Sequence, residues 1–375
     1  MRQISAEVPA AVAAYHRLIS EHVAGLSIEE QIRPRGERRR LETVAELVVA
    51  YLAYAQGEYA KNGAPTSEVA DVRAACSYLT AEYADLPLAE LGPLKLRAVR
   101  AAMIRRGLAR STINAYVHRL QAMACWAGEH ELADPAWPRG LACVRALRQG
   151  RGGRETPQRQ PVERAAVEAV LARATAPVAA MIELQWHAGL RPGEAVGLRR
   201  SALHRGGEVW FASVADHKSA HLGEGHVRIV PLGPAAQALL TPWIAAAEAA
   251  GRDWLFSPAV AVAELRERQR AGRIARGGGG NRKRRRPGRQ RRVPAERYSV
   301  ASYRRCIARA CQAAGIPAWS PHRLRHSFAT RVLEVCGSSE LDALAAALGH
   351  RQVNTTLLYA HLLRSKGADL ARRVG

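Results

Sequence analysis

Apolar residues recur every three to four positions along most of residues 1–147, which is the spacing of amphipathic helices. The segment 1–39 is expected to hold one helix, over 7–24, and then a basic linker. Residues 40–147 show no convincing period-two alternation, so we predict a small helical domain there. Its expected helices lie in LETVAELVVAYLAYAQGEYA, TSEVADVRAACSYLTAEYA, KLRAVRAAMIRRG and RSTINAYVHRLQAMACWAGEHE.

The periodic pattern stops over residues 148–162, RQGRGGRETPQRQPV, which are rich in Gly, Pro and Arg and predict an interdomain linker. A second domain, 163–375, is expected to open with helices up to residue 190. EVWFASV and HVRIVPL then alternate as strands and predict a hairpin with a long loop. Helices resume at Pro234. The predicted fold class is therefore mainly α with a small antiparallel β-sheet.

One basic insertion, 265–293, interrupts these last helices. Within it, ARGGGGNRKRRRPGRQRR (275–292) has a run of four glycines and then eight basic residues in its final eleven, which cannot bury a core, so we expect disorder in the free protein. Contact with DNA phosphates is the favoured role, and simple insertion between two helices is the alternative. The residues expected to bind DNA are Arg282, Lys283, Arg284, Arg285 and Arg286.

Net charge says more about the partner of this protein than any other global property of the sequence. The 375 residues carry a formal net charge of +23; residues 265–293 account for +12, and the others still carry +11. Such a bias indicates a polyanionic partner, because neutralising phosphates releases counterions. No apolar run approaches the roughly 20 residues of a membrane span, and no export signal is apparent. With six scattered cysteines and no zinc spacing, we expect a soluble, cytoplasmic protein without a structural metal.

Candidate chemistry begins with HAGLRPGEAVGL. Arg191 directly precedes Pro192, a favourable first helical residue, so its guanidinium is expected at a helix N-terminus, where anions are favoured. Glu194 lies three residues further on and is suited to capping the turn or orienting Arg191. Many helices begin this way, so the motif by itself is weak.

A second motif is SPHRLRHSFAT, in which a Ser-Pro pair is expected to cap and begin a helix. His322 and Arg325 are three residues apart on one face, so both could reach the same phosphate. Arg323 and His326 point elsewhere and are expected to be structural or to contact the backbone.

Two further candidates complete the set. Lys218, in the hairpin loop, is the only lysine between the linker and the basic insertion, and lysine can lose a proton whereas arginine effectively cannot. Its neighbour His217 is the competing acid. In LGHRQVNTTLLYAHLL, His350 is followed nine positions later by Tyr359, which alone would be read as a core tyrosine.

Together these residues suit attack on a phosphodiester, which builds negative charge on the non-bridging oxygens and needs a nucleophile and a leaving-group acid. The arginines and histidines can supply donors, Lys218 can protonate a departing 5′ oxygen, and Tyr359 can attack once neighbouring cations favour the phenolate. No metal, nucleotide or other cofactor is required.

In order and spacing, GLRPGE, the hairpin Lys, HRLRH, LGH and the Tyr nine residues later resemble the tyrosine recombinase (phage integrase) family. The resemblance covers nearly the whole chain, since TINAYVHRLQAMACWA looks like the last helix of the family's core-binding domain. It implies a helical SAM-like core-binding domain and an α+β catalytic domain that clamp duplex DNA. The long hairpin loop and the basic insertion depart from the family pattern.

The resemblance also implies an activity: integration, excision or resolution of a mobile element at a specific DNA site. Tyr359 would form a 3′-phosphotyrosyl bond, and a homo-tetramer would exchange strands through a Holliday junction, with room for accessory DNA-bending proteins and a nucleoid-associated location. The alternatives are a type IB topoisomerase or telomere resolvase, a non-catalytic DNA-binding protein, and an RNA-binding protein.

Overall fold

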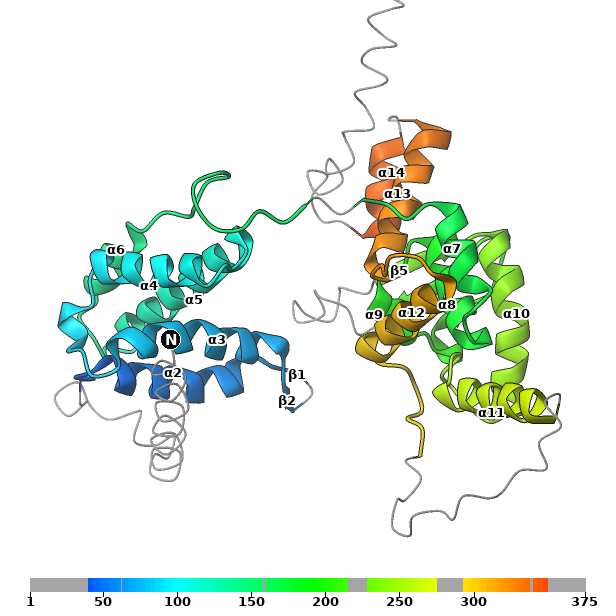
Figure 1. The fold of residues 1–375 in the computed structure, drawn as a ribbon, viewed down its shortest axis with the longest axis horizontal. Coiled ribbons are helices and arrows are strands. Elements are labelled where there is room, and N and C mark those ends of the chain that lie inside the picture. Colours follow the sequence, from blue (N-terminus) through cyan, green and yellow to red (C-terminus); the bar gives the residue numbers. More distant parts are fainter. Residues whose placement is uncertain are drawn as a thin grey trace, which may run out of the picture. The chain divides into compact units, whose positions relative to one another are not determined.

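A computed structural model gives the fold (Figure 1). Two compact units, Met1–Gln158 and Arg159–Gly375, each contain their own hydrophobic core. The helix expected over 7–24, the basic run 275–292 and the tail after residue 349 lie outside the described part of the chain. The structure describes residues 40–61, 63–157, 160–214, 228–274, 293–337 and 340–349.

The first unit is built from helices, as the apolar spacing predicts. Its helices pack with α5 against α2, α3, α4 and α6, so the core lies around α5. The elements are α2 (Val44–Glu58), β1 (Ala60–Lys61), β2 (Ala64–Pro65), α3 (Ser67–Tyr83), the 3-10 turn η2 (Leu88–Glu90), α4 (Pro93–Arg105), α5 (Arg110–Glu129) and α6 (Trp137–Ala142).

Local signals and one ion pair explain how these helices are fixed. The Thr43 side chain accepts a hydrogen bond from the Glu46 amide at 3.2 Å and so caps α2. Proline at the first position starts α4. Arg119 on α5 donates to both carboxylate oxygens of Glu68 on α3, at 2.7 and 2.8 Å, which joins these two helices.

The expectation that residues 40–147 contain no strand was wrong in one place. β1 and β2 form an antiparallel hairpin in which Ala60 pairs with Pro65 and Lys61 with Ala64. Gly63 has φ +74, a left-handed conformation that glycine adopts readily, and it lies in the connection. Two residues per strand are too few to show a period, so the hydrophobic pattern could not reveal them.

The stretch 148–162, predicted as a linker, is anchored at both ends. The Arg110 amide donates to the Arg154 carbonyl at 2.9 Å, and the Arg154 amide donates to the Leu108 carbonyl at 3.0 Å, which fixes the first part to unit 1. Val162 is 5% exposed in the core of unit 2, where its amide donates to Ser327 Oγ at 2.7 Å. Such backbone pairing is independent of side-chain type, so a Gly- and Arg-rich composition does not exclude it.

The second unit is a helical body with a three-stranded sheet. Its elements are α7 (Arg164–Leu171), α8 (Ala176–Ala188), α9 (Pro192–Val196), η3 (Arg200–Ala202), β3 (Leu203–His204), β4 (Trp210–Val214), β5 (Arg228–Leu232), α10 (Pro234–Ala249), α11 (Pro258–Ile274), α12 (Val300–Ala314), α13 (His322–Cys336) and α14 (Leu341–Leu348).

Helix α8 is the centre of this unit. It contacts α7, α9, α10, α11, α12, α13 and β5, and most of its residues are buried, including Met181, Ile182 and Leu184 at 0% exposure. The four residues of α8 that are not buried, Ala176, Ala179, Glu183 and His187, lie on one face, and the rest of the helix surface is in the core. Because α8 ends at Ala188, the turn that carries Arg191 begins in the most deeply buried part of the unit.

The sheet has the order β3-β4-β5 and is antiparallel throughout. Trp210 pairs with Leu232 and Val214 with Arg228, so the two predicted strands form the expected hairpin. On β5 the buried residues alternate with more exposed ones, and the inward positions are Arg228, Val230 and Leu232.

Helix α14 is held less extensively than α8. It packs against α13 and β5, and its own apolar cluster has only four buried members, Ala329, Leu333, Leu344 and Leu348. Within the described residues, no helix combines the length and the apolar character that crossing a membrane would require.

Candidate active site

The turn after α8 places Arg191. Gly189 ends α8 with φ +63, and a Cβ there would lie 2.9 Å from Phe328 Cε1, so both the backbone conformation and the packing require glycine. The next carbonyl, of Leu190, accepts a hydrogen bond from Gln185 Nε2 at 2.7 Å. These two contacts fix the backbone immediately before Arg191.

Arg191 and Glu194 form a closed pair at the start of α9. Arg191 is the residue before Pro192, and its amide donates to Glu194 Oε2 at 2.8 Å. Its guanidinium Nη1 donates to Glu194 Oε1, also at 2.8 Å. Glu194 therefore both caps the turn and orients the guanidinium. The Glu194 side chain is 3% exposed and that of Arg191 is 30% exposed, so only the arginine can meet a large ligand.

Arg325 comes from α13 and is 3% exposed. Its Nη1 donates to the Gly189 carbonyl at 3.0 Å, and its Nη2 donates to the Leu348 carbonyl. Arg325 therefore joins the turn that carries Arg191 to the end of α14.

His322 is the first residue of α13, one turn before Arg325. Its ring packs edge-to-face with that of His326, with centroids 5.3 Å apart. Arg323 contacts the backbone, as expected: it donates to the carbonyls of Gln160 and Pro161 at 2.7 and 2.9 Å.

The start of α13 corrects one expectation. The capping position is occupied by Pro321, and no side chain caps the helix. Ser320 contributes its backbone carbonyl, which accepts from the Arg323 amide at 2.9 Å. The Ser-Pro pair thus forms a turn just before the helix. This is possible because the φ that proline fixes is compatible both with a turn and with the first residue of a helix.

Arg228 is a functional candidate that the sequence reasoning missed. Its side chain is 6% exposed, and its Nε lies 3.5 Å from Glu194 Oε1. Nη2 donates to the Ala347 carbonyl at 2.6 Å, and Nη1 to the carbonyls of Ala346 and Ile229 at 3.3 and 3.2 Å. Burial lowers the pKa of Arg228, and the nearby Glu194 carboxylate opposes that shift. A signal was present, since in HVRIVPL the arginine shares the inward register of Val230 and Leu232.

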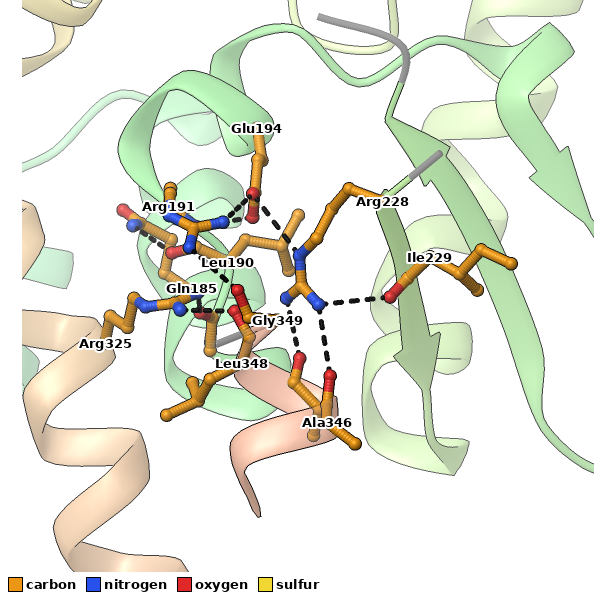
Figure 2. A network of polar contacts seen from close by, with 12 residues as sticks. Gln185, Leu190, Arg191, Glu194, Arg228, Ile229, Arg325, Ala346, Leu348 and Gly349 are labelled. Carbon is orange, nitrogen blue, oxygen red and sulfur yellow. Dashed lines mark hydrogen bonds and ion pairs between the residues drawn. The ribbon is translucent and has the colours of Figure 1, made fainter. Parts of the chain in front are cut away.

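Three guanidinium groups therefore surround the end of α14 (Figure 2). They bind four consecutive carbonyls at the end of the helix, where few amides of the helix can donate and where the negative end of the helix dipole lies. Of the four, the Ala346 carbonyl also accepts from the Gly349 amide at 2.9 Å. The pairs are Arg228 with Ala346 and Ala347, Arg325 with Leu348, and Arg191 with Gly349 at 3.3 Å.

A hydrogen bond between Tyr303 and Gln185, which the sequence did not predict, also supports the turn before Arg191. The hydroxyl of Tyr303, on α12, donates to Gln185 Oε1 at 2.9 Å, while Gln185 Nε2 holds the Leu190 carbonyl. Both side chains are 0% exposed, and burial raises the pKa of Tyr303 well above its usual value. The two residues are 118 positions apart, and no local sequence pattern indicates such a pairing.

The remaining predicted site residues lie outside the described part of the chain. These are Lys218, His350, Tyr359 and the basic residues Arg282, Lys283, Arg284, Arg285 and Arg286. The described chain ends at Gly349, the residue directly before His350, at the same place where the three arginines meet. Among the described residues, this cluster holds three cations and one buried carboxylate, an arrangement suited to an anionic group such as a phosphodiester.

Comparison with known proteins identifies the family. The model of the phage integrase family matches residues 162–366, which is more than half of the chain, so this chain belongs to the phage integrase family. Tyrosine recombinase XerC of Bifidobacterium longum subsp. infantis is 29% identical over 185 residues, covering 49% of this chain and 43% of that protein. The chain thus spans about half the length of the relatives it matches.

Solved structures agree on the fold. The XerH site-specific recombinase bound to palindromic difH substrate aligns with a TM-score of 0.60 at 15% identity, over 95% of this chain and 94% of that one. A lambda integrase dimer bound to a COC′ core site gives a TM-score of 0.59 at 14% identity, over 84% of this chain and 77% of that one. The fold is that of tyrosine recombinases, mainly helical with small antiparallel sheets.

Proposed function

We propose that this protein is a site-specific DNA recombinase that cleaves and rejoins DNA through a 3′-phosphotyrosyl intermediate. The observation that carries the proposal is the convergence of Arg191 and Arg325 on the adjacent carbonyls of Gly349 and Leu348. The turn after α8 and helix α13 bring these cations together from distant parts of the sequence. They meet at the Leu-Gly of LGH, whose histidine is followed nine residues later by the tyrosine, in a chain of the phage integrase family.

The proposed roles follow from charge and proton balance. The Tyr359 oxygen attacks the phosphorus while the bond from phosphorus to the 5′ oxygen breaks, and Lys218 gives that oxygen its proton. Arg191, Arg325, His322 and His350 offset the charge that develops on the non-bridging oxygens. Because one phosphoester replaces another, rejoining needs no ATP and no metal.

Glu194 has a supporting role in this scheme, since it orients Arg191 without facing the substrate. The partner is double-stranded DNA that carries a specific recombination site, as in the XerH and lambda integrase complexes. We place the reaction in the cytoplasm, on the nucleoid. A homo-tetramer on two DNA sites and accessory DNA-bending proteins belong to the same proposal.

The first unit is proposed as the core-binding domain, and its charge distribution indicates the DNA-facing side. Residues 91–157 contain twelve Lys or Arg and four Asp or Glu, whereas residues 40–90 contain three and eight. A polyanion is attracted to the first set and repelled by the second. The basic side includes the exposed Arg97 and Arg105 of α4.

The test is covalent trapping on labelled duplexes taken from DNA flanking the gene. The wild-type protein is incubated with the DNA in EDTA, quenched with detergent and compared with Tyr359→Phe on a denaturing gel. A protein–DNA adduct in the wild type alone supports tyrosine chemistry and locates the cleavage site. Binding without an adduct would contradict the proposal and favour a non-catalytic DNA-binding protein. Supercoil relaxation with no recombinant product would favour a topoisomerase.

A further inference from the structure

Arg228 lies beside the candidate active site without being one of the residues that the sequence motifs single out. We propose that Arg228 is a positioning residue for DNA cleavage, one that fixes the end of α14 and compensates the charge of Glu194 so that Arg191 and Arg325 are held ready for the phosphate. The inference rests on the proposed function and adds a residue to it. Its basis is the geometry of the four carbonyls at the end of α14.

The first argument concerns how α14 is anchored. Its apolar cluster is small, and an open surface groove of about 280 Å³ lies between α13 and α14, lined by residues that include Phe328, Val332 and Ala347. Apolar packing at the end of the helix is confined to one side, where Leu344 and Leu348 are 2% and 0% exposed. The arginine contacts to the carbonyls of the last turn restrain the helix end from the other elements of the site.

Arg228 satisfies a different pair of carbonyls from the other two arginines. It takes Ala346 and Ala347, whereas Arg325 takes Leu348 and Arg191 takes Gly349. Without Arg228, neither of these two carbonyls would have a charged donor. The Ala346 carbonyl would keep the Gly349 amide, whereas the Ala347 carbonyl would lose its hydrogen bond from Arg228, and a buried polar group without a partner is costly. The end of α14 would then detach or shift, and Arg191 and Arg325 would no longer have the fixed point that they share (Figure 2).

The second argument concerns charge. Glu194 Oε1 accepts from Arg191 Nη1 at 2.8 Å and lies 3.5 Å from Arg228 Nε. If Arg228 is removed, Arg191 alone among the described residues balances this buried carboxylate. Less of the positive charge of Arg191 is then available to a phosphate, and the charge of the cluster falls by one.

Arg228 acts through these neighbours and not on the DNA itself. Its side chain is 6% exposed, and all three of its nitrogens face acceptors of the protein: Nε the Glu194 carboxylate, Nη1 the Ile229 and Ala346 carbonyls, and Nη2 the Ala347 carbonyl. A Cβ at Gly349 would lie 2.8 Å from Arg228 Cδ and Cζ, so the guanidinium is closely covered by the backbone of that glycine. A substrate phosphate could reach the 30% exposed Arg191 much more readily.

The experiment compares Arg228→Gln, which removes the charge, with Arg228→Lys, which keeps it. Arg331→Gln is the control, because Arg331 is half-buried in unit 2 and, like Arg228, donates to a helix carbonyl, that of Trp186 at 2.7 Å. Single-turnover adduct formation and DNA affinity are measured for all three. We expect Arg228→Gln to cleave about 10- to 100-fold more slowly at unchanged affinity, the usual range for residues that orient a reactive group. Arg228→Lys should recover at least half of that loss on a logarithmic scale, and Arg331→Gln should stay within about twofold of the wild type.

A second substrate shows whether Arg228→Gln slows cleavage by changing the charge at the site or by making the fold less rigid. In a duplex whose scissile phosphate is replaced by a methylphosphonate, one non-bridging oxygen no longer carries charge. The ratio of wild-type to Arg228→Gln rates should fall at least threefold on this substrate, because less charge needs to be offset. A ratio equal on both substrates, or equal rates for wild type and Arg228→Gln, would overturn the inference.

The outcomes for the two proposals are distinguishable. If the wild type forms no adduct on DNA that it binds, the proposed function fails, and this inference fails with it. If the wild type is active and Arg228→Gln does not fold, Arg228→Lys decides. For each protein, the cleavage rate on the phosphate substrate is divided by the rate on the methylphosphonate substrate. If Arg228→Lys gives the same quotient as the wild type, the charge role is supported. If its quotient is at least threefold lower, the charge role is contradicted.

Discussion

Replacing Gly349 by alanine tests the contact between α14 and Arg228 directly. Gly349 has φ +63, and an L-residue in this region costs about 1–2 kcal/mol. The new Cβ would also lie 2.8 Å from Arg228 Cδ and Cζ, well inside van der Waals contact. Either the arginine or the helix end must move, which breaks the hydrogen bonds from Arg228 to Ala346 and Ala347.

The magnitude follows from those bonds. A hydrogen bond that involves a charged group contributes about 1.5–3 kcal/mol, so breaking one or both, with partial relaxation, should cost about 2–4 kcal/mol beyond the backbone term. Gly315→Ala is the matched control, since Gly315 ends α12 with φ +71 and a Cβ there has nothing within 4 Å. That variant should show the backbone term of about 1–2 kcal/mol alone.

Hydrogen–deuterium exchange is the appropriate assay because α14 can open locally without the whole unit unfolding. The opening free energy of the α14 peptide in Gly349→Ala is compared with that of the α12 peptide in Gly315→Ala, each relative to the wild type. The extra loss at α14 corresponds to about 30- to 1,000-fold faster exchange. Equal losses in the two variants would refute the argument that Arg228 holds the end of this helix.

Two other predictions concern the support of the site and its DNA-facing side. Tyr303→Phe removes the hydroxyl that donates to the buried Gln185, so urea unfolding should show a loss of about 1–3 kcal/mol, together with a slower cleavage rate; an unchanged free energy would mean that this buried bond is dispensable. Arg97→Ala combined with Arg105→Ala should reduce the slope of log affinity against log salt by about 2, roughly one for each phosphate that is no longer neutralised. The control is Arg73→Ala, an exposed arginine on the acidic α3, and an equal effect of Arg73→Ala would argue against the assignment of the basic side.

The parts of the fold that follow local rules could be predicted from the sequence. Periodicity indicated the helices of both units and the strands that became β4 and β5, and the mainly helical fold class is confirmed. The Arg191 turn was also accessible, because proline at the first helical position and Glu194 three residues later are local capping signals. The hairpin of β1 and β2 was missed because two-residue strands show no period.

The contacts of the site could not be predicted in the same way. Arg191, Arg325 and Arg228 all bind backbone carbonyls, and every residue type offers a carbonyl, so the sequence does not mark the acceptor. The pairing of Gln185 with Tyr303 depends on how α8 packs against α12, which periodicity alone does not determine. Arg228 was the exception, since its inward register in β5 was available before the structure was known.

The unequal anchoring of α8 and α14 has a consequence for when the site exists. The turn with Arg191 continues from a helix that has most of its residues buried in the core, so it should open only when unit 2 as a whole unfolds. The end of α14 rests on a small cluster and on arginine contacts, so it should open far more often. The fraction of molecules competent for cleavage is then the closed population of α14, and apparent activity scales with that fraction. Substitutions near α14 that touch neither DNA nor the arginines can therefore change the rate by shifting this equilibrium alone.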